Sequence, residues 1–116
     1  IRVPVIKATA LAGDSAVDDV LGWPAAVVPL VDVVDPVRRG GTGRTADWNA
    51  AARVARRRPL VLAGGLAPAN VEAAVRLVRP FAVDVSSGVE QAPGLKDADR
   101  IRALVAAVAR ADAHRE

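Results

Sequence analysis

Hydrophobic residues along the chain gather in four short runs rich in β-branched side chains, and each run is followed by a segment with helical periodicity. The runs cover residues 3–9, 26–34, 59–63 and 81–85. Strands that are apolar at nearly every position are typical of parallel sheets covered on both faces. The alternation of strands and helices therefore predicts an α/β fold of four parallel β/α units.

The helical segments are each expected to bury one apolar stripe. The predicted stripes are Val17, Val20 and Leu21; Trp48, Ala51, Ala52 and Ala55; Val71, Val75 and Val78; and Ile101, Leu104, Val105 and Val108. Asp47 is expected to cap the second helix, and Pro68 to open the third. Arg56, Arg57 and Arg58 are interpreted as a solvated end of the second helix, where cations suit the helix dipole.

Composition restricts the classes of protein. A chain of 116 residues with 52% hydrophobic and 25% charged residues fits one globular domain. No apolar run is long enough to cross a bilayer and no signal-peptide pattern opens the sequence, so we expect no membrane contact and a cytoplasmic location. The chain has no cysteine, which excludes disulfides, thiolate metal sites and a cysteine nucleophile. The single histidine, His114, is interpreted as a solvated tail residue.

The charge pattern argues against a nucleic-acid partner. The formal net charge is +3, the basic residues are scattered, and aromatic residues make up only 3% of the chain. A nucleic-acid binder is expected to show a denser basic face or stacking aromatic side chains.

Chemistry in parallel β/α folds gathers at the carboxyl ends of the strands. The sequence predicts these ends near Lys7, at Asp32, at Gly64-Gly65 and at 84–86. Alternation puts Asp32 on one face with Val28 and Leu30, and Asp84 on one face with Ala82 and Ser86, while Val83 and Val85 point toward the helices.

Two consecutive loops in this position, "AGGLAPAN" (63–70) and "SSGVEQAPGLKD" (86–97), are rich in glycine and small residues. Backbone N–H groups at such strand-to-helix junctions can bind a phosphate without a basic side chain. The alternative is a pair of ordinary tight turns. As a pair, the loops favour a phosphate site.

The carboxylates and the lysine at the strand ends leave alternatives open. Asp32 is either a general acid or a loop residue that accepts backbone hydrogen bonds. Asp84 is either an orienting group for a ligand or a structural hydrogen-bonding residue. Lys7 either contacts a substrate or only places its ammonium group at the mouth of the strand.

Three motifs carry a resemblance to a known family. In the segments "GGTGRTADW" (40–48), "LAGGLAPANV" (62–71) and "VDVSSGVEQAPGLKD" (83–97), the chain closely resembles phosphoribosylanthranilate isomerase, an enzyme of tryptophan biosynthesis. "VIKA" (5–8) and "LVD" (30–32) match the family's fifth and sixth strands. The family fold is an eight-stranded β/α barrel, so residues 1–116 are expected to form a single domain that corresponds to strands five to eight.

The resemblance also implies a reaction and a site. The family catalyses an Amadori rearrangement of N-(5′-phosphoribosyl)anthranilate without a metal or organic cofactor. By resemblance Asp32 is the general acid, Asp84 lies near the anthranilate, and the glycine loop at 40–43 covers the active site. The residues implied in binding the substrate phosphate are Gly64, Gly65, Ser86, Ser87 and Gly88.

The family's general base is a cysteine that ends its first strand. This sequence departs from the family here, because it contains neither that strand nor any cysteine. Loss of a general base costs about 10² to 10⁴ in rate. Ala46 replaces a common phenylalanine, and Ala67 replaces a common helix cap at a cost of about 1 kcal/mol. The chain is therefore expected to be inactive without an amino-terminal half.

Four parallel strands cannot close a barrel, so both sheet edges need a partner. We expect association with an amino-terminal half-barrel or with a second copy; rearrangement to an open sheet and aggregation are the alternatives. A different function class is a half-barrel that binds phosphorylated ligands, or itself, without turnover. A related sugar-phosphate barrel of the histidine pathway is a third hypothesis, against which "GGTGRTADW" argues.

Overall fold

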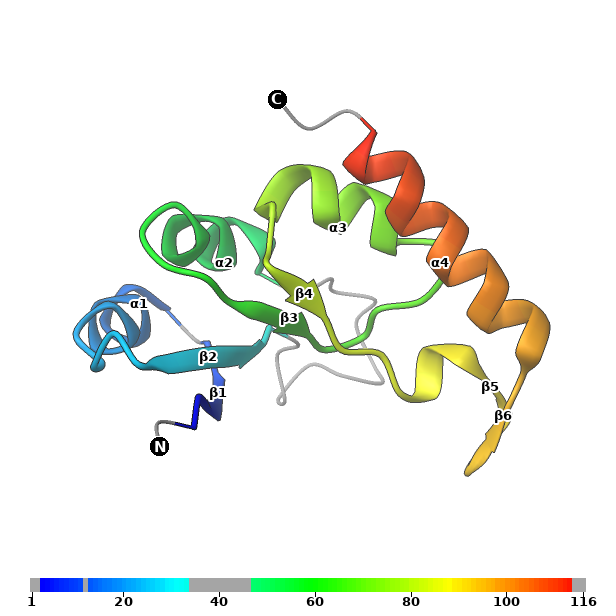
Figure 1. The fold of residues 1–116 in the computed structure, drawn as a ribbon, viewed down its shortest axis with the longest axis horizontal. Coiled ribbons are helices and arrows are strands. Elements are labelled where there is room, and N and C mark those ends of the chain that lie inside the picture. Colours follow the sequence, from blue (N-terminus) through cyan, green and yellow to red (C-terminus); the bar gives the residue numbers. More distant parts are fainter. Residues whose placement is uncertain (1–2, 12, 34–46, 114–116) are drawn as a thin grey trace.

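The computed structural model describes residues 3–11, 13–33 and 47–113. Its centre is a sheet of four parallel strands in the order β1-β2-β3-β4, with helices packed along one face (Figure 1). This confirms the predicted parallel α/β architecture. The strands of the sheet and the helices are β1 (Val5–Ala10), α1 (Gly13–Leu21), β2 (Val27–Asp32), α2 (Trp48–Ala55), β3 (Val61–Ala63), α3 (Val71–Val78), β4 (Ala82–Val83) and α4 (Ala98–Asp112).

The loop at 40–43, Ala46 and His114 lie outside the described residues. What the sequence predicts for them stays a prediction.

The first strand runs further than the sequence predicted. β1 pairs with β2 over six residues, from Val5 opposite Val27 to Ala10 opposite Asp32. Lys7 therefore lies in the middle of the strand, and its predicted position at the strand mouth is wrong. The Lys7 ammonium instead lies 4.6 Å from the centre of the Trp23 ring, which is a cation–π contact.

The main core lies between the sheet and the helices. Val31, Leu60 and Leu62 are completely buried there, and α1 and α2 contribute Val17, Val20 and Val54. Val83 and Val85 pack against the same cluster, which confirms the predicted alternation in the fourth strand. Burial of such side chains contributes about 1.5–3 kcal/mol each, so this face holds the sheet and the helices together.

The second helix begins and ends close to the predicted positions. Asp47 accepts a hydrogen bond from the Ala50 N–H at 3.0 Å, which confirms the predicted cap. The prediction for Arg58 was wrong. The residue is half-buried, and its guanidinium donates to the backbone carbonyls of Val20, Trp23, Pro24 and Val27. Arg58 thus fixes the connection between α1 and β2, because that turn leaves several carbonyls close together.

The last helix buries a different stripe from the predicted one. α4 packs along α3 through Ala107 and Ala111, which are at most 2% exposed, with Leu104 and Val108 partly buried beside them. Alanines let the two helices approach closely. Val105 is 61% and Ile101 40% exposed. The predicted stripe was therefore right for Leu104 and Val108 and wrong for Ile101 and Val105. The apolar pattern alone did not show that α3 would pack against the alanine side of α4.

The segment between the last strand and α4 contains structure that the sequence did not predict. A 3-10 turn, η1 (Ser87–Val89), leads into an antiparallel hairpin of β5 (Glu90–Ala92) and β6 (Leu95–Lys96). Pro93 and Gly94 form its tip, and Gly94 has φ 79°, a conformation that glycine adopts without strain. The Pro-Gly pair was the sequence signal for this hairpin.

Candidate active site

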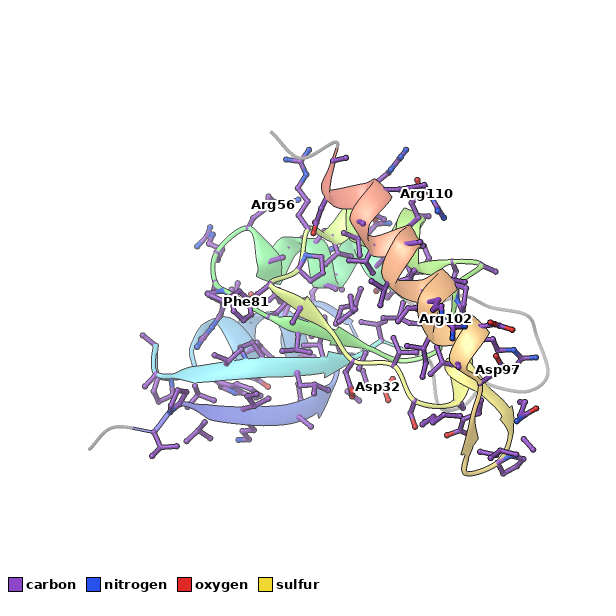
Figure 2. All side chains as sticks on the ribbon, turned by 45° about the vertical axis from the view of Figure 1, so that its right-hand side comes forward. Asp32, Arg56, Phe81, Asp97, Arg102 and Arg110 are labelled. Carbon is purple, nitrogen blue, oxygen red and sulfur yellow. The ribbon has the colours of Figure 1, made fainter. Side chains whose placement is uncertain are left out.

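A hollow of about 200 Å³ opens at the carboxyl ends of β2, β3 and β4. Figure 2 shows Asp32 at the end of β2, beside the loop that leaves β4. All seven residues proposed for the site from the sequence line this hollow. They are Asp32, Gly64, Gly65, Asp84, Ser86, Ser87 and Gly88. The structure therefore brings the residues together; their chemical roles remain predictions.

The first wall is the turn after β3. Gly64 and Gly65 have φ angles of 99° and 67°, which other residues adopt only with strain. Asn70 fixes this turn: its Oδ1 accepts a hydrogen bond from the Ala67 N–H at 2.8 Å and its Nδ2 donates to the Gly65 carbonyl at 2.9 Å.

This arrangement corrects the prediction that the third helix opens at Pro68. α3 starts at Val71, and residues 68–70 form a turn instead. Asn70 is placed as the cap, but its side chain holds the glycine turn rather than the helix. The asparagine that follows "GGLAPA" was the sequence signal for this role.

The second wall is the turn after β4. It touches the first directly, because a Cβ atom added to Gly88 would lie 1.9 Å from the carbonyl oxygen of Leu66. Only glycine permits this approach. Leu66 and Gly88 are 22 residues apart along the chain, and their contact joins the two loops into one continuous rim.

An ion pair lies behind the second turn. The Lys96 ammonium is 2.6 Å from Glu90 Oε2 and 3.0 Å from the Ser86 carbonyl oxygen, to which it donates. The hydrogen bond from Lys96 lowers the pKa of the Glu90 carboxyl group, and the Gly94 N–H adds to this effect. The predictions from sequence missed both residues. The sequence feature that could have indicated the pair is the two-residue turn Pro93-Gly94, because this turn places Glu90 opposite Lys96.

The two carboxylates of the hollow come from strands on either side of β3. Asp32 ends β2, opposite Ala63 of β3, and Asp84 follows β4, with its N–H bonded to the Leu62 carbonyl. Both side chains are exposed to solvent. They can therefore meet a ligand that enters from outside, and a protonated carboxyl group here can donate to it.

A larger groove, of about 580 Å³, lies on another side of the same turns, between Pro68 and Arg100. Its charged residues serve the fold, since Asp97 caps α4 and Arg100 donates to the Glu90 carbonyl. The smaller hollow is the candidate active site, because it lies at the strand ends and contains the two carboxylates.

Within residues 3–11, 13–33 and 47–113, no three acidic or histidine side chains lie close enough together to hold a metal ion. None of the helices in these ranges is long and apolar enough to span a bilayer.

Comparison with known proteins identifies the family. Residues 1–107 match the family model described as "N-(5'phosphoribosyl)anthranilate (PRA) isomerase". The chain belongs to this family. Similar proteins include the N-(5′-phosphoribosyl)anthranilate isomerase of Roseiflexus sp. strain RS-1, which is 63% identical over 78 residues, or 67% of this chain and 36% of the relative.

Solved structures of the family have the same fold. The crystal structure of phosphoribosylanthranilate isomerase from Thermotoga maritima is 42% identical, with a TM-score of 0.79 over 94% of this chain and 53% of that chain. A second structure of the isomerase, in complex with reduced 1-(o-carboxyphenylamino)-1-deoxyribulose 5-phosphate, is 38% identical, with a TM-score of 0.73 over 91% of this chain and 48% of that chain. The chain thus spans about half the length of these relatives.

Proposed function

We propose that this chain forms the carboxy-terminal half of a phosphoribosylanthranilate isomerase barrel, with residues 1–116 as one domain of four β/α units. In this proposal it binds the phosphate of N-(5′-phosphoribosyl)anthranilate and supplies the general acid of the Amadori rearrangement. The observation that carries the proposal is the single hollow that combines both glycine-rich turns with Asp32 and Asp84.

The phosphate is assigned to the two turns. The hollow of about 200 Å³ is lined by Gly64, Gly65, Ser86, Ser87 and Gly88, residues that carry backbone N–H groups and, at the two serines, hydroxyls. Such donors suit a dianion, and β/α barrels often bind phosphate after their last two strands. The family structure with a bound deoxyribulose 5-phosphate compound supports a phosphorylated ligand of this class.

Asp32 is assigned the role of general acid. It would protonate the ring oxygen of the ribose, so that the C1′–O bond breaks and the nitrogen lone pair forms an iminium ion. A base then removes the C2′ proton, and the electron pair of that bond neutralises the iminium. Asp84, on the other side of β3, would orient the anthranilate amine. These steps need no cofactor, because the substrate nitrogen itself accepts the electrons.

The base must come from outside this chain if it is the family's cysteine, since the sequence contains none. The edges of the sheet support completion by further strands. β1 and β4 are its outer strands, and apolar side chains near them are exposed, Ile6 by 60% and Phe81 by 76%. Phe81 is labelled in Figure 2. Parallel strands are normally covered on both faces, so an amino-terminal half-barrel is the proposed partner.

Complementation tests this proposal. The chain is mixed with a separately produced amino-terminal half-barrel of a relative, and loss of the substrate's fluorescence is followed. We expect turnover from the mixture and none from either half alone. Asp32→Asn should lower kcat by about 10² to 10⁴. If this variant is as active as the unchanged mixture, Asp32 is not the general acid.

A second candidate is a half-barrel that binds phosphorylated ligands and pairs with a second copy without turnover. The missing cysteine and the exposed apolar residues at both sheet edges favour it. Light scattering separates the candidates: this one predicts a stable dimer that binds phosphate and gains no activity when the amino-terminal half is added.

A further inference from the structure

The second glycine-rich turn is held by the side chain of Lys96, which does not line the hollow. The Ser86 carbonyl oxygen accepts hydrogen bonds from Lys96 Nζ at 3.0 Å and from the Val89 N–H at 3.3 Å. Both donors come from residues later in the chain. The position of this oxygen is therefore set by the 3-10 turn and by the hairpin together.

The orientation of this carbonyl also sets the direction of the Ser87 N–H. The Ser86 C=O and the Ser87 N–H belong to one planar trans peptide, in which the two groups point in opposite directions. An oxygen that is held toward Lys96 therefore turns the Ser87 N–H away from Lys96. Ser87 lines the hollow between the two turns.

The charge of Lys96 is already paired. Glu90 Oε2 lies 2.6 Å from its ammonium group, and Glu90 in turn accepts from the Gly94 N–H at 3.3 Å. An ammonium balanced in this way attracts an anion in the hollow only weakly. What the pair contributes is geometry, because Glu90 holds the long lysine side chain beneath the turn.

The hairpin that carries Lys96 is anchored to the last helix. The Asp97 N–H donates to the Val89 carbonyl at 2.7 Å, and the Arg100 guanidinium donates to the Glu90 carbonyl. These hydrogen bonds restrict the position of the backbone that carries Lys96.

We infer that Lys96, held by Glu90, is a positioning residue that aims the Ser87 N–H at the substrate phosphate. This inference rests on the proposed phosphate site and adds residues to it that do not line the hollow.

Titration of the full chain with inorganic phosphate, followed through the backbone amide resonances of Gly65 and Ser87, tests the inference. We expect phosphate to shift both amides in the unchanged chain. In Lys96→Met, Kd should rise about tenfold, as expected for loss of a hydrogen bond from a charged group, and the Ser87 response should shrink more than that of Gly65. Lys96→Arg should recover most of the affinity because it keeps a cationic donor.

Arg102→Met is the matched control, since it breaks an exposed ion pair with Asp99 on α4; its Kd should not change. If Lys96→Met fails to fold, Glu90→Gln takes its place, with an expected rise in Kd of about threefold. Equal affinity in the unchanged and substituted chains would overturn the role of Lys96 but leave the phosphate site standing. No amide response in the unchanged chain would overturn both.

Discussion

The two turns that form the rim of the hollow are held in place by different kinds of hydrogen bond. The turn after β3 is held locally, by Asn70, which bonds to Gly65 and Ala67. The turn after β4 is held through a hairpin, by Lys96 and Glu90. Asn70 uses neutral hydrogen bonds and Lys96 uses charged ones. Neither Asn70 nor Lys96 lines the hollow, so each holds its turn without filling the space proposed for the ligand.

The largest effect is expected where the turns meet. Gly88→Ala places a methyl group 1.9 Å from the Leu66 oxygen, so the turns must separate. We expect a loss of about 3 kcal/mol in the free energy of unfolding, measured by urea denaturation with tryptophan fluorescence, and loss of phosphate binding. Gly22→Ala is the control, because its new Cβ would meet Asp19 at an ordinary 3.5 Å. Equal effects of the two substitutions would mean that the turns do not meet as described.

Asn70→Ala breaks the local support of the first turn only. Loss of its two hydrogen bonds should lower the free energy of unfolding by about 1–2 kcal/mol and weaken phosphate binding through the Gly65 amide more than through Ser87. Asn49→Ala, an exposed change within α2, should change stability by less than about 0.5 kcal/mol. The same loss in both variants would remove Asn70 from the support of the turn.

Gly65→Ala tests the backbone conformation rather than the contacts. At φ 67°, a Cβ atom costs about 1–2 kcal/mol. Gly65→Asn should be less harmful, because asparagine tolerates this region better than alanine. Thermal denaturation of both variants checks the order, and an alanine variant more stable than the asparagine variant would contradict it.

The smallest effect concerns the charged support of the second turn and depends on pH. The pKa of Glu90 is lowered in the folded chain, so its carboxylate contributes stability that is complete above its ordinary value of 4.5. The contribution is lost as the pH falls through the lowered pKa. Glu90→Gln should therefore be slightly less stable than the unchanged chain at neutral pH, and equally stable once the pH is below the lowered pKa of Glu90. A difference in melting temperature that stays constant with pH would contradict this.

The sequence by itself determined the parallel α/β architecture, the Asp47 cap and seven of the residues that line the hollow. Strand and helix periods are local properties, and the strand ends of parallel units meet at one edge of a sheet. Only the tertiary structure decided which side of α4 is buried, where Lys7 lies, and that Arg58, Asn70 and Lys96 hold turns. Their partners are carbonyl and N–H groups whose positions depend on the backbone path, and a pattern of side chains does not record that path.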